Sequence, residues 1–213
     1  MARKNENAGK RADPRVNSSD PDSGPMPTAK GWIQGYNAQL VVSDDQLILA
    51  AQATDQLGDV EQYASMIEAA QTGIDALNRG RGDGDKVEIG IVTADAGYLS
   101  EANLSEPGPD PLIATGKRYE LEKAAQQRSD QPEPAAAETE PPKLAEAMAR
   151  RLETDTAMQT YRRRGVTVEP VNGHLKDRIG LRQFSRRGIQ AVQAELVLAA
   201  SVANLLKIYR HGR

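Results

Sequence analysis

The sequence predicts a mixed α/β fold, because strand-type and helical patterns follow one another along its 213 residues. Two short apolar runs separated by turn residues indicate a hairpin, and a nearly all-apolar run, Val87–Ala94, indicates a buried central strand. Apolar residues at helical spacing follow the hairpin and fill the last third of the chain. The expected order is therefore strands, a helix, two more strands and terminal helices.

The elements can be placed in order from the N-terminus. Residues 1–30 are polar and contain Asp-Pro steps, which predicts a disordered or extended arm ahead of a domain at 31–213. The hairpin is expected to consist of Gln34–Val42 and Gln46–Thr54. A helix is expected from Val60 to Leu77, because its apolar residues recur every three or four positions.

Further strands and helices are expected after Val87–Ala94. A further short buried strand is expected at Pro111–Thr115, and Pro/Glu/Ala-rich residues 126–142 predict a flexible insertion. The remaining helical segments are Ser100–Leu104, Lys143 to about Arg163, Pro170–Lys176 and Ile189–Tyr209. We expect the last of these to be a core helix that covers the sheet, with a dimer interface as the alternative.

Composition excludes several classes of protein. Aromatic residues are 4% of the chain, so the core must consist mostly of Ala, Val, Ile and Leu. The absence of Cys excludes disulfides, thiolate zinc sites and a Cys nucleophile. No apolar run of about 18 residues is present, so we expect no transmembrane helix. The polar N-terminus lacks the apolar segment of a secretory signal, and we expect a soluble, cytoplasmic protein.

The last third of the chain is basic. From Tyr161 onward there are 11 Lys and Arg against 3 Asp and Glu, whereas the whole chain has a formal net charge of −3. Such a concentration of positive charge is expected of a surface that binds a polyanion such as nucleic acid. The alternative is a solvated helix that is rich in Arg.

Asp95 is the first candidate for chemistry. It ends the expected strand Val87–Ala94, and the carboxyl edge of a sheet is where ligands bind in open α/β folds. Gly97 lets the chain turn sharply just after it. The alternative is that Asp95 caps a following helix.

Glu169 is the second candidate. It precedes Pro170, and because Pro is tolerated in the first turn of a helix, we expect a helix to begin here. Lys176 lies two turns further on, about 10 Å along the helix axis, so both side chains would act on one extended ligand. The alternative is a surface helix with scattered charges.

Together these residues are the groups required for metal-assisted phosphoryl transfer. In that chemistry two divalent cations about 4 Å apart activate a water or a 3′-hydroxyl and stabilise the leaving oxygen. Carboxylates such as Asp95 and Glu169 suit Mg²⁺. Basic side chains would follow the phosphate backbone. They are Arg162, Arg163, Arg164, Lys176, Arg178, Arg182, Arg186 and Arg187.

Several motifs resemble those of bacterial insertion-sequence transposases of the DDE class. Residues 94–98, Ala-Asp-Ala-Gly-Tyr, resemble the block around the second catalytic Asp of that family. Its Tyr/Arg/Glu/Lys signature is resembled by Tyr161, Arg164, Glu169 and Lys176. Shorter landmarks are Gly35–Gln39, Ile113–Lys117 and Arg182–Gly188. The resemblance covers roughly residues 18–210.

The resemblance implies an RNase H-like core, a mixed sheet flanked by helices, that cuts and rejoins double-stranded DNA at transposon ends. It implies Mg²⁺ or Mn²⁺ as cofactor and a bacterial cytoplasmic, nucleoid-associated location, with a homodimer as a further expectation. Asp95 and Glu169 would be catalytic metal ligands, the second and third members of the acidic triad. The DNA-binding residues would be Tyr161, which would pack or contact near the cut end, and Arg163, Arg164, Lys176, Arg178 and Arg182.

Three departures from the family pattern shape the expectation. The gap from Arg164 to Glu169 is one residue longer than in the most familiar signature, and Asn172 stands where an aromatic residue is common. No Asp matches the family's first catalytic Asp. We therefore expect a C-terminal fragment whose sheet lacks its N-terminal strand and whose activity alone is weak or absent. A non-catalytic DNA-binding remnant and an RNase H-like nuclease are the alternatives.

Overall fold

The computed structural model describes residues 17–28, 31–56, 58–116 and 143–211. The chain has the predicted mixed α/β class, but its strands form three two-stranded sheets instead of one mixed sheet. The strands are β1 (Gly24–Thr28), β2 (Gly31–Gly35), β3 (Asn37–Val42), β4 (Ile48–Thr54), β5 (Ile91–Ala94) and β6 (Asp110–Ile113). The helices are α1 (Tyr63–Asn78), α2 (Glu101–Leu104), α4 (Leu144–Leu152), α5 (Asp155–Asp177) and α6 (Ile189–His211).

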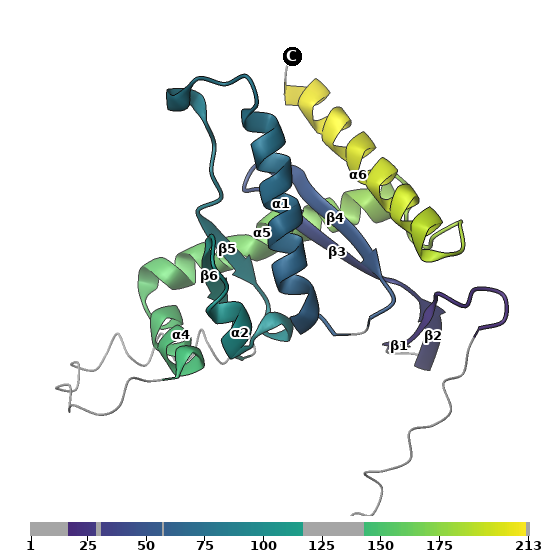
Figure 1. The fold of residues 1–213 in the computed structure, drawn as a ribbon, viewed down its shortest axis with the longest axis horizontal. Coiled ribbons are helices and arrows are strands. Elements are labelled where there is room, and N and C mark those ends of the chain that lie inside the picture. The colour runs from purple at the N-terminus through teal and green to yellow at the C-terminus, as the bar shows by residue number, and fades with distance from the viewer. Residues whose placement is uncertain (1–16, 29–30, 57, 117–142, 212–213) are drawn as a thin grey trace, which may run out of the picture.

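The predicted hairpin and the helix after it are confirmed. β3 and β4 pair antiparallel, and α1 packs across one face of them (Figure 1). A single 3-10 turn, η1 (Val60–Gln62), leads into α1. The apolar side of α1 that the sequence predicted is buried, with Met66, Ala70 and Ile74 against the sheet side. Helix α5 crosses behind both β3–β4 and β5–β6, so the strands lie between two helical layers.

The predicted central strand Val87–Ala94 is shorter and less buried than expected. Only Ile91–Ala94 form β5, which pairs in parallel with β6. Ile91 is 48% exposed, and of the four residues only Ala94 is buried. The apolar run therefore does not report a strand with neighbours on both sides. The strand predicted at Pro111–Thr115 is confirmed as β6, whose Leu112 and Ile113 are fully buried.

The predicted helix start at Pro170 is wrong, because α5 runs without interruption from Asp155 to Asp177. Proline lacks the N–H that would bond to the carbonyl four residues earlier. That carbonyl, of Val166, instead accepts a hydrogen bond from Gln46 Nε2 at 3.1 Å. A side chain from the hairpin turn thus satisfies the group that Pro170 leaves open.

Helix α6 closes the outer edge of the hairpin with side-chain amides. Asn204 bonds both the N–H and the carbonyl of Ile48, at 2.8 and 2.9 Å. Gln193 bonds the N–H of Ala53 and the carbonyl of Ala51, at 2.7 and 2.9 Å. Unpaired strand edges invite aggregation, so these bonds protect β4.

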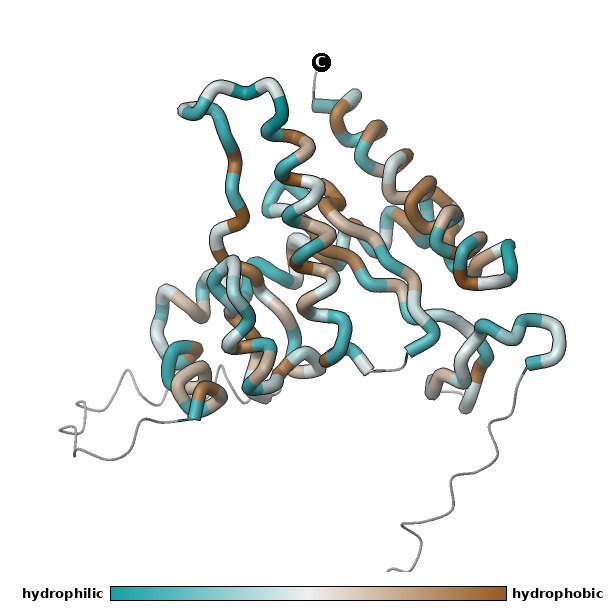
Figure 2. Tube along the Cα trace, viewed as in Figure 1, coloured by the Kyte–Doolittle hydropathy of each residue, from teal (hydrophilic) through white to brown (hydrophobic). Residues whose placement is uncertain are grey.

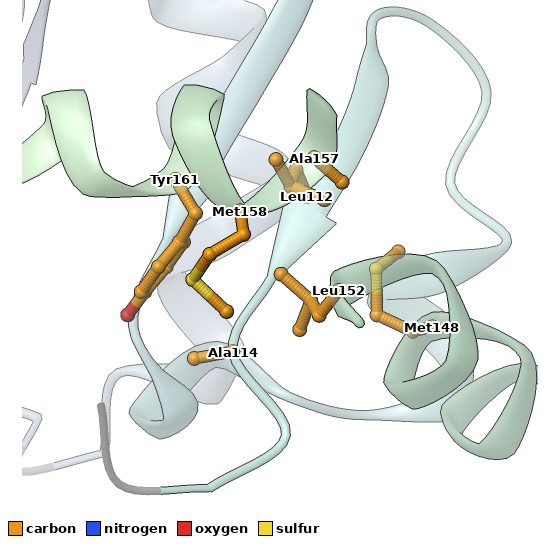
Figure 3. Close-up of a cluster of buried hydrophobic side chains, with 7 residues drawn as sticks. All are labelled: Leu112, Ala114, Met148, Leu152, Ala157, Met158 and Tyr161. Atoms are coloured by element: carbon orange, nitrogen blue, oxygen red, sulfur yellow. The ribbon is translucent and has the colours of Figure 1, made fainter. Parts of the chain in front are cut away.

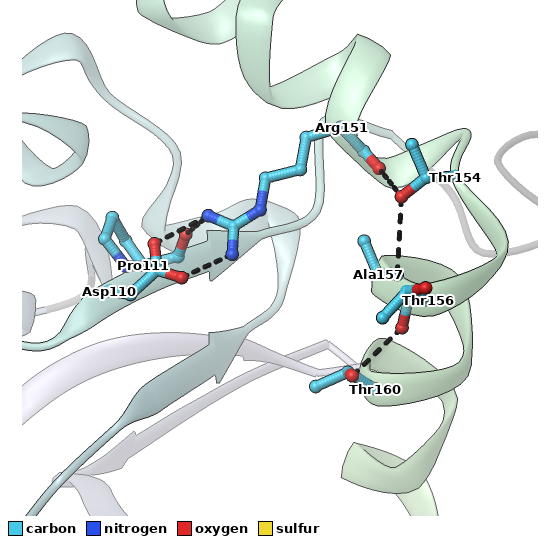
Figure 4. Close-up of polar contacts among 7 residues, drawn as sticks. All are labelled: Asp110, Pro111, Arg151, Thr154, Thr156, Ala157 and Thr160. Carbon is cyan, nitrogen blue, oxygen red and sulfur yellow. Dashed lines mark hydrogen bonds and ion pairs between the residues drawn. The ribbon is translucent and has the colours of Figure 1, made fainter.

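Helices α4 and α5 dock on β6 through one apolar cluster and one ion pair. Figure 3 shows the cluster of Leu112, Ala114, Met148, Leu152, Ala157, Met158 and Tyr161. Arg151 forms a bidentate pair with Asp110 and also bonds the carbonyl of Pro111 (Figure 4). The hydrogen bond with Arg151 lowers the pKa of Asp110. Thr154 caps α5 by accepting from the N–H of Ala157.

Part of the expected N-terminal arm is structured. Residues 17–28 form turns and β1, where a disordered or extended arm was expected for 1–30. Asp20 and Asp22 accept hydrogen bonds from the backbone N–H groups of Gly188 and Ile189, both at 3.0 Å. These carboxylates satisfy N–H groups at the start of α6, where negative charge is favourable. Residues 1–16 and the insertion predicted at 126–142 lie outside the described residues.

Helix α6 corrects the expectation that no helix could span a membrane. It has the length and the apolar composition to cross one, and 28% of its most apolar stretch is buried inside the protein. The predicted core role holds for one face, on which Val192 and Leu196 are buried. Leu198 and Leu205, on another face, are each 66% exposed.

Candidate active site

Asp95 lies at the carboxyl end of β5, as the sequence predicts. The chain turns there into a 3-10 helix, η3 (Ala96–Tyr98), and Asp95 Oδ1 accepts a hydrogen bond from the N–H of Gly97 at 3.1 Å. Asp95 therefore caps this turn, which was the alternative to a ligand-binding role. Capping uses one oxygen, and the side chain is 48% exposed. Its second oxygen therefore remains accessible.

A second carboxylate, Asp59, lies beside Asp95. A Cβ placed on Gly97 would be 3.0 Å from Asp59 Oδ2 and 3.1 Å from Asp95 Oδ1. These two oxygens are therefore no more than about 6 Å apart. Asn37 Nδ2 and Gln39 Nε2 donate to Asp59 Oδ1 at 3.0 and 2.7 Å, which fixes this carboxylate against β3.

Gln39 connects Asp59 to the turn that carries Asp95. Its side chain is 5% exposed, and its carbonyl oxygen accepts a hydrogen bond from the Tyr98 hydroxyl. Burial, reinforced by the charges of Asp59 and Asp95, raises the pKa of Tyr98. Tyr98 therefore stays a neutral donor to Gln39. The hydrogen bonds of Gln39 to Asp59 and Tyr98 hold these three side chains in one geometry.

Arg164, on α5, lies next to Asp95. Its Nη1 lies 3.6 Å from Asp95 Oδ2, and its guanidinium lies 5.6 Å from the centroid of the Tyr161 ring. Tyr161 is 5% exposed and belongs to the cluster of Figure 3, where it packs beneath Arg164. This burial is what the packing role expected for Tyr161 requires, and its DNA-binding role stays a prediction.

Glu169 lies on α5 but faces elsewhere. Five residues separate it from Arg164, which corresponds to about 140° around the helix and about 7.5 Å along it. Glu169 is exposed, and its side chain makes no hydrogen bond or ion pair with the described residues. Within the described part of the chain, no three Asp, Glu or His side chains gather closely enough to hold a metal ion.

Comparison with protein families supplies the deciding observation. Residues 123–209 match the family model described as "Transposase DDE domain". The matched range contains α4, α5 and most of α6, including Arg164 and Glu169. No curated protein and no solved structure matches the chain.

This segment is similar to a transposase DDE domain. The match supports a DDE-class transposase fragment, as the sequence motifs predict. Asp95 lies outside the matched transposase segment, yet Arg164 from within that segment contacts it. The ion pair therefore ties the earlier Asp95 block to the transposase segment in space.

Two of the shorter transposase landmarks contact each other. The rings of Tyr36 and Phe184 meet edge to face with centroids 6.3 Å apart, and the N–H of Gly188 donates to the Tyr36 hydroxyl at 3.2 Å. Burial and a 2.6 Å hydrogen bond to Asp20 raise the pKa of Tyr36 to about 12. The landmark Gly35–Gln39 thus has two parts: Tyr36 anchors the start of α6, while Asn37 and Gln39 hold Asp59.

The basic residues expected to bind DNA lie on the outside of the transposase segment. Arg163 is 66% exposed and lies 3.4 Å from Asp44, and Arg182 pairs with Asp177 beyond the end of α5. Lys176 and Arg178 are also exposed. Exposure of these groups is what phosphate contacts require.

A cavity of about 300 Å³ lies between α5, α6 and the hairpin turn. It contains basic side chains and no acidic ones. It is lined by Gln46, Ile48, Pro170, Val171, His174, Ala203, Lys207, Arg210 and His211. His174 and Arg210 make no side-chain hydrogen bond with the described residues. Both groups are thus available to an anion.

Sequence reasoning missed Asp59 and gave Gln39 no role. Asn37 and Gln39 are two residues apart on β3, so both side chains project from one face of the strand. Polar residues repeated at this spacing within an apolar strand were the available signal. No comparable local pattern marked Asp59, because its partners lie 20 and 22 residues away.

Proposed function

We propose that this chain acts in DNA transposition, through metal-dependent cleavage and strand transfer on double-stranded DNA by an RNase H-like core. One observation carries the proposal: Arg164 of the transposase segment contacts Asp95 at the end of β5. Two motifs that are distant in sequence, each resembling a catalytic block of the family, therefore meet at one rim. A transposase of this class works in the bacterial cytoplasm, on nucleoid DNA.

Asp95 and Glu169 are the proposed ligands of Mg²⁺ or Mn²⁺. The donor chemistry of Asp95 fits such a cation, because its Oδ1 accepts one N–H and its Oδ2 lies 3.6 Å from Arg164, beyond a hydrogen bond. Asp59 is a further carboxylate within reach of Asp95. Bound divalent cations would supply an activated water and stabilise the leaving oxygen. For Glu169 to share a cation with Asp95, α5 must turn or its side chain must reach past Arg164.

The proposed DNA surface follows α5 and the segment after it. Arg164 would position a phosphate next to Asp95, while Arg163 and Lys176 would contact the backbone along the helix. Arg178 and Arg182 extend this surface beyond the end of α5. The plot of log affinity against log salt concentration has a negative slope, and each lost phosphate contact should make it less steep by about 0.9.

A non-catalytic DNA-binding role is the second candidate, and a specific observation favours it. The cation that faces Asp95 is a guanidinium, and the described residues hold no group of three metal-ligating side chains. An Asp95–Arg164 pair can hold β5 and α5 together without any chemistry. In that case the basic surface would bind DNA, and Asp95 would have a structural role.

Nicking of a plasmid that carries the element's ends, with Mg²⁺ or Mn²⁺, distinguishes the two candidates. Catalysis predicts weak but detectable cleavage by the wild type, because the first catalytic Asp of the family has no counterpart here, with a further loss in Asp95→Asn and Glu169→Gln and unchanged cleavage in Asp75→Asn on α1. Binding of Mn²⁺, followed by its electron paramagnetic resonance spectrum, should weaken in the first two variants. DNA binding without cleavage, and Mn²⁺ binding equal in all variants, would establish the non-catalytic role.

A further inference from the structure

The cavity between α5, α6 and the hairpin turn is lined by both histidines of the chain. His174 comes from α5 and His211 from α6, and the sequence contains no other histidine. Lys207 and Arg210 add two basic side chains from α6, and among the described residues no acidic side chain lines the cavity. Its volume, about 300 Å³, is at the lower end of small-molecule sites. Asp95 and its neighbours do not line it, so it is separate from the candidate active site.

The walls of the cavity are apolar and already in place. Ile48, Val171 and Ala203 line it, and all three are buried members of one packed cluster. Pro170 lines the α5 side, where its ring takes the place of a backbone N–H. Side chains in a close-packed cluster keep their shape without a ligand. A ring or a short apolar chain would therefore be covered by a preformed surface, which lowers the entropy cost of binding.

Gln46 holds the ammonium group of Lys207 at the cavity. Its Oε1 accepts a hydrogen bond from Lys207 Nζ at 2.9 Å, while its Nε2 donates to the carbonyl of Val166 at 3.1 Å. The backbone of Gln46 has a φ of 60°, a conformation that is costly for a residue with a Cβ and that is concentrated at ligand sites. Lys207 uses one of its three N–H groups on Gln46, and the other two make no hydrogen bond with the described residues.

The charge at the cavity stays positive after the helix dipoles are counted. The last turns of both α5 and α6 reach the cavity, and each helix end carries about half a negative charge. Lys207 and Arg210 carry two positive charges at neutral pH, so the balance is about one positive charge with both histidines neutral. Figure 2 shows hydrophilic positions at the C-terminal end of α6, beyond more hydrophobic positions in its middle. The open end of the cavity is therefore polar and basic, and its walls are apolar.

The carboxylates of the adjoining segments do not neutralise this charge. Asp44 in the hairpin turn pairs with Arg163, and Asp177 at the end of α5 pairs with Arg182. Asp45 is exposed and does not line the cavity. Within the described part of the chain, the basic groups of the cavity thus lack an acidic partner, and an anionic ligand would supply one.

The donors reach the cavity from two helices, so they approach a ligand from different directions. His174 belongs to α5, whereas Lys207 and Arg210 belong to α6. A carboxylate has two oxygens in one plane, whereas a terminal phosphate has three acceptor oxygens that point in different directions. We propose that this cavity binds a small phosphate monoester, with its phosphate at these three side chains and its apolar part against Ile48 and Ala203. The proposal does not depend on the proposed role in transposition.

Titration of the protein with phenyl phosphate, followed by proton NMR of the histidine rings, tests the site. Both histidines of the chain line the cavity, so their ring signals report on it directly. The signals of both rings should shift at millimolar phenyl phosphate. Phenyl phosphate should bind about tenfold or more tightly than inorganic phosphate, because its ring covers the apolar wall. Unshifted histidine signals, or equal affinity for the two probes, would overturn the proposal.

Replacing Arg210 with Gln tests which basic groups hold the phosphate. Affinity for phenyl phosphate, measured by calorimetry, should fall by about tenfold or more, because a charge-assisted hydrogen bond is lost. Arg150→Gln on α4 is the matched control, because Arg150 is exposed, makes the same change in net charge and does not line the cavity. Its affinity should equal that of the wild type. Equal losses in the two variants would show a response to net charge alone and would refute the site.

A phosphate monoester can be a free small molecule or the 5′-phosphate of a DNA strand, and competition against phenyl phosphate separates these sources. The competitors are one DNA duplex with 5′-phosphates and the same duplex without them. Displacement by the phosphorylated duplex alone would identify a DNA end, and displacement by neither would identify a free small molecule; both results support the proposal. Equal displacement by the two duplexes would show binding of the phosphodiester backbone and would contradict it. No cleavage is measured, so the outcome is independent of the proposed role in transposition.

Discussion

Arg164 Nη1 lies 3.6 Å from Asp95 Oδ2 while the same guanidinium lies over the ring of Tyr161. One side chain thus connects the buried cluster of β6, α4 and α5 to the carboxylate at the end of β5. Arg164 therefore holds Asp95 in a fixed position relative to the packed core. Loss of this side chain should therefore affect the candidate active site more than it affects the fold.

Replacing Arg164 with Gln should reduce the free energy of unfolding by about 0.5–1 kcal/mol. The ion pair is partly exposed, 31% at Arg164 and 48% at Asp95, so solvent screens it, and the contact with Tyr161 contributes a similar small amount. DNA affinity at low salt should fall more clearly. Urea unfolding and fluorescence anisotropy measure the two effects.

Arg163→Gln is the matched control for this prediction. Arg163 lies one position away, and its pair with Asp44 is 66% and 72% exposed. Its replacement should change stability by less than about 0.5 kcal/mol. If both variants lost the same stability and the same DNA affinity, Arg164 would have no special position.

Replacing Gly97 with Ala should disturb the candidate active site directly. The added Cβ would lie 3.0 Å from Asp59 Oδ2 and 3.1 Å from Asp95 Oδ1, closer than ordinary contacts. We expect a loss of about 1–3 kcal/mol in unfolding free energy as the two carboxylates move apart. Gly173→Ala in α5 meets nothing within 4 Å and should stabilise by about 0.5–1 kcal/mol. Equal effects in thermal unfolding would contradict the crowding at Gly97.

The elements that the sequence predicts well are those whose signal is local. The hairpin of β3 and β4 follows from two apolar runs around a turn, and α1 follows from the spacing of Met66, Ala70 and Ile74. In both, the residues that decide the structure are neighbours in the chain. Asp95 belongs to the same group, because a strand end and a following Gly97 lie within one short segment.

Other features depend on residues that are distant in sequence. Val87–Ala94 looks like a central strand, but β5 is short because β6 is its only neighbour among the described strands. Pro170 looks like a helix start, but a bond from Gln46, 120 residues away, lets α5 continue through it. The position of Asp59 beside Asp95 follows from the packing of η1 against η3 and has no local signature.

Alkaline pH should destabilise the protein through Tyr63. Burial, with the charges of Asp110 and Glu106, raises the pKa of Tyr63 from 10.0 to about 12. The contribution of neutral Tyr63 to the free energy of unfolding is therefore fully present below pH 10. It is lost as pH rises toward 12, because Tyr63 in the unfolded chain deprotonates first. In Tyr63→Phe this loss should decrease by about 2 kcal/mol in urea unfolding at pH 10–12. A constant difference between the two proteins is expected at pH 6–9. A wild type whose unfolding free energy did not fall faster than that of the variant above pH 10 would contradict the role of Tyr63.

Gln46 and Pro170 should be energetically coupled, because Gln46 Nε2 bonds the Val166 carbonyl that Pro170 leaves without a helical donor. Pro170→Ala restores the helical N–H and should stabilise the protein by about 1–3 kcal/mol. Gln46→Ala should cost about 0.5–1 kcal/mol in the wild type, because the exposed carbonyl of Val166 then loses its protein partner.

The coupling is measured by a double-mutant cycle in thermal or urea unfolding. In the Pro170→Ala background, Gln46→Ala should cost at least about 0.5 kcal/mol less than in the wild type, because the Val166 carbonyl now has the N–H at position 170. The bond from Lys207 to Gln46 is lost in both backgrounds and therefore cancels. Strictly additive effects would mean that water, not Gln46, satisfies the carbonyl of Val166, and that the continuity of α5 through Pro170 has another cause.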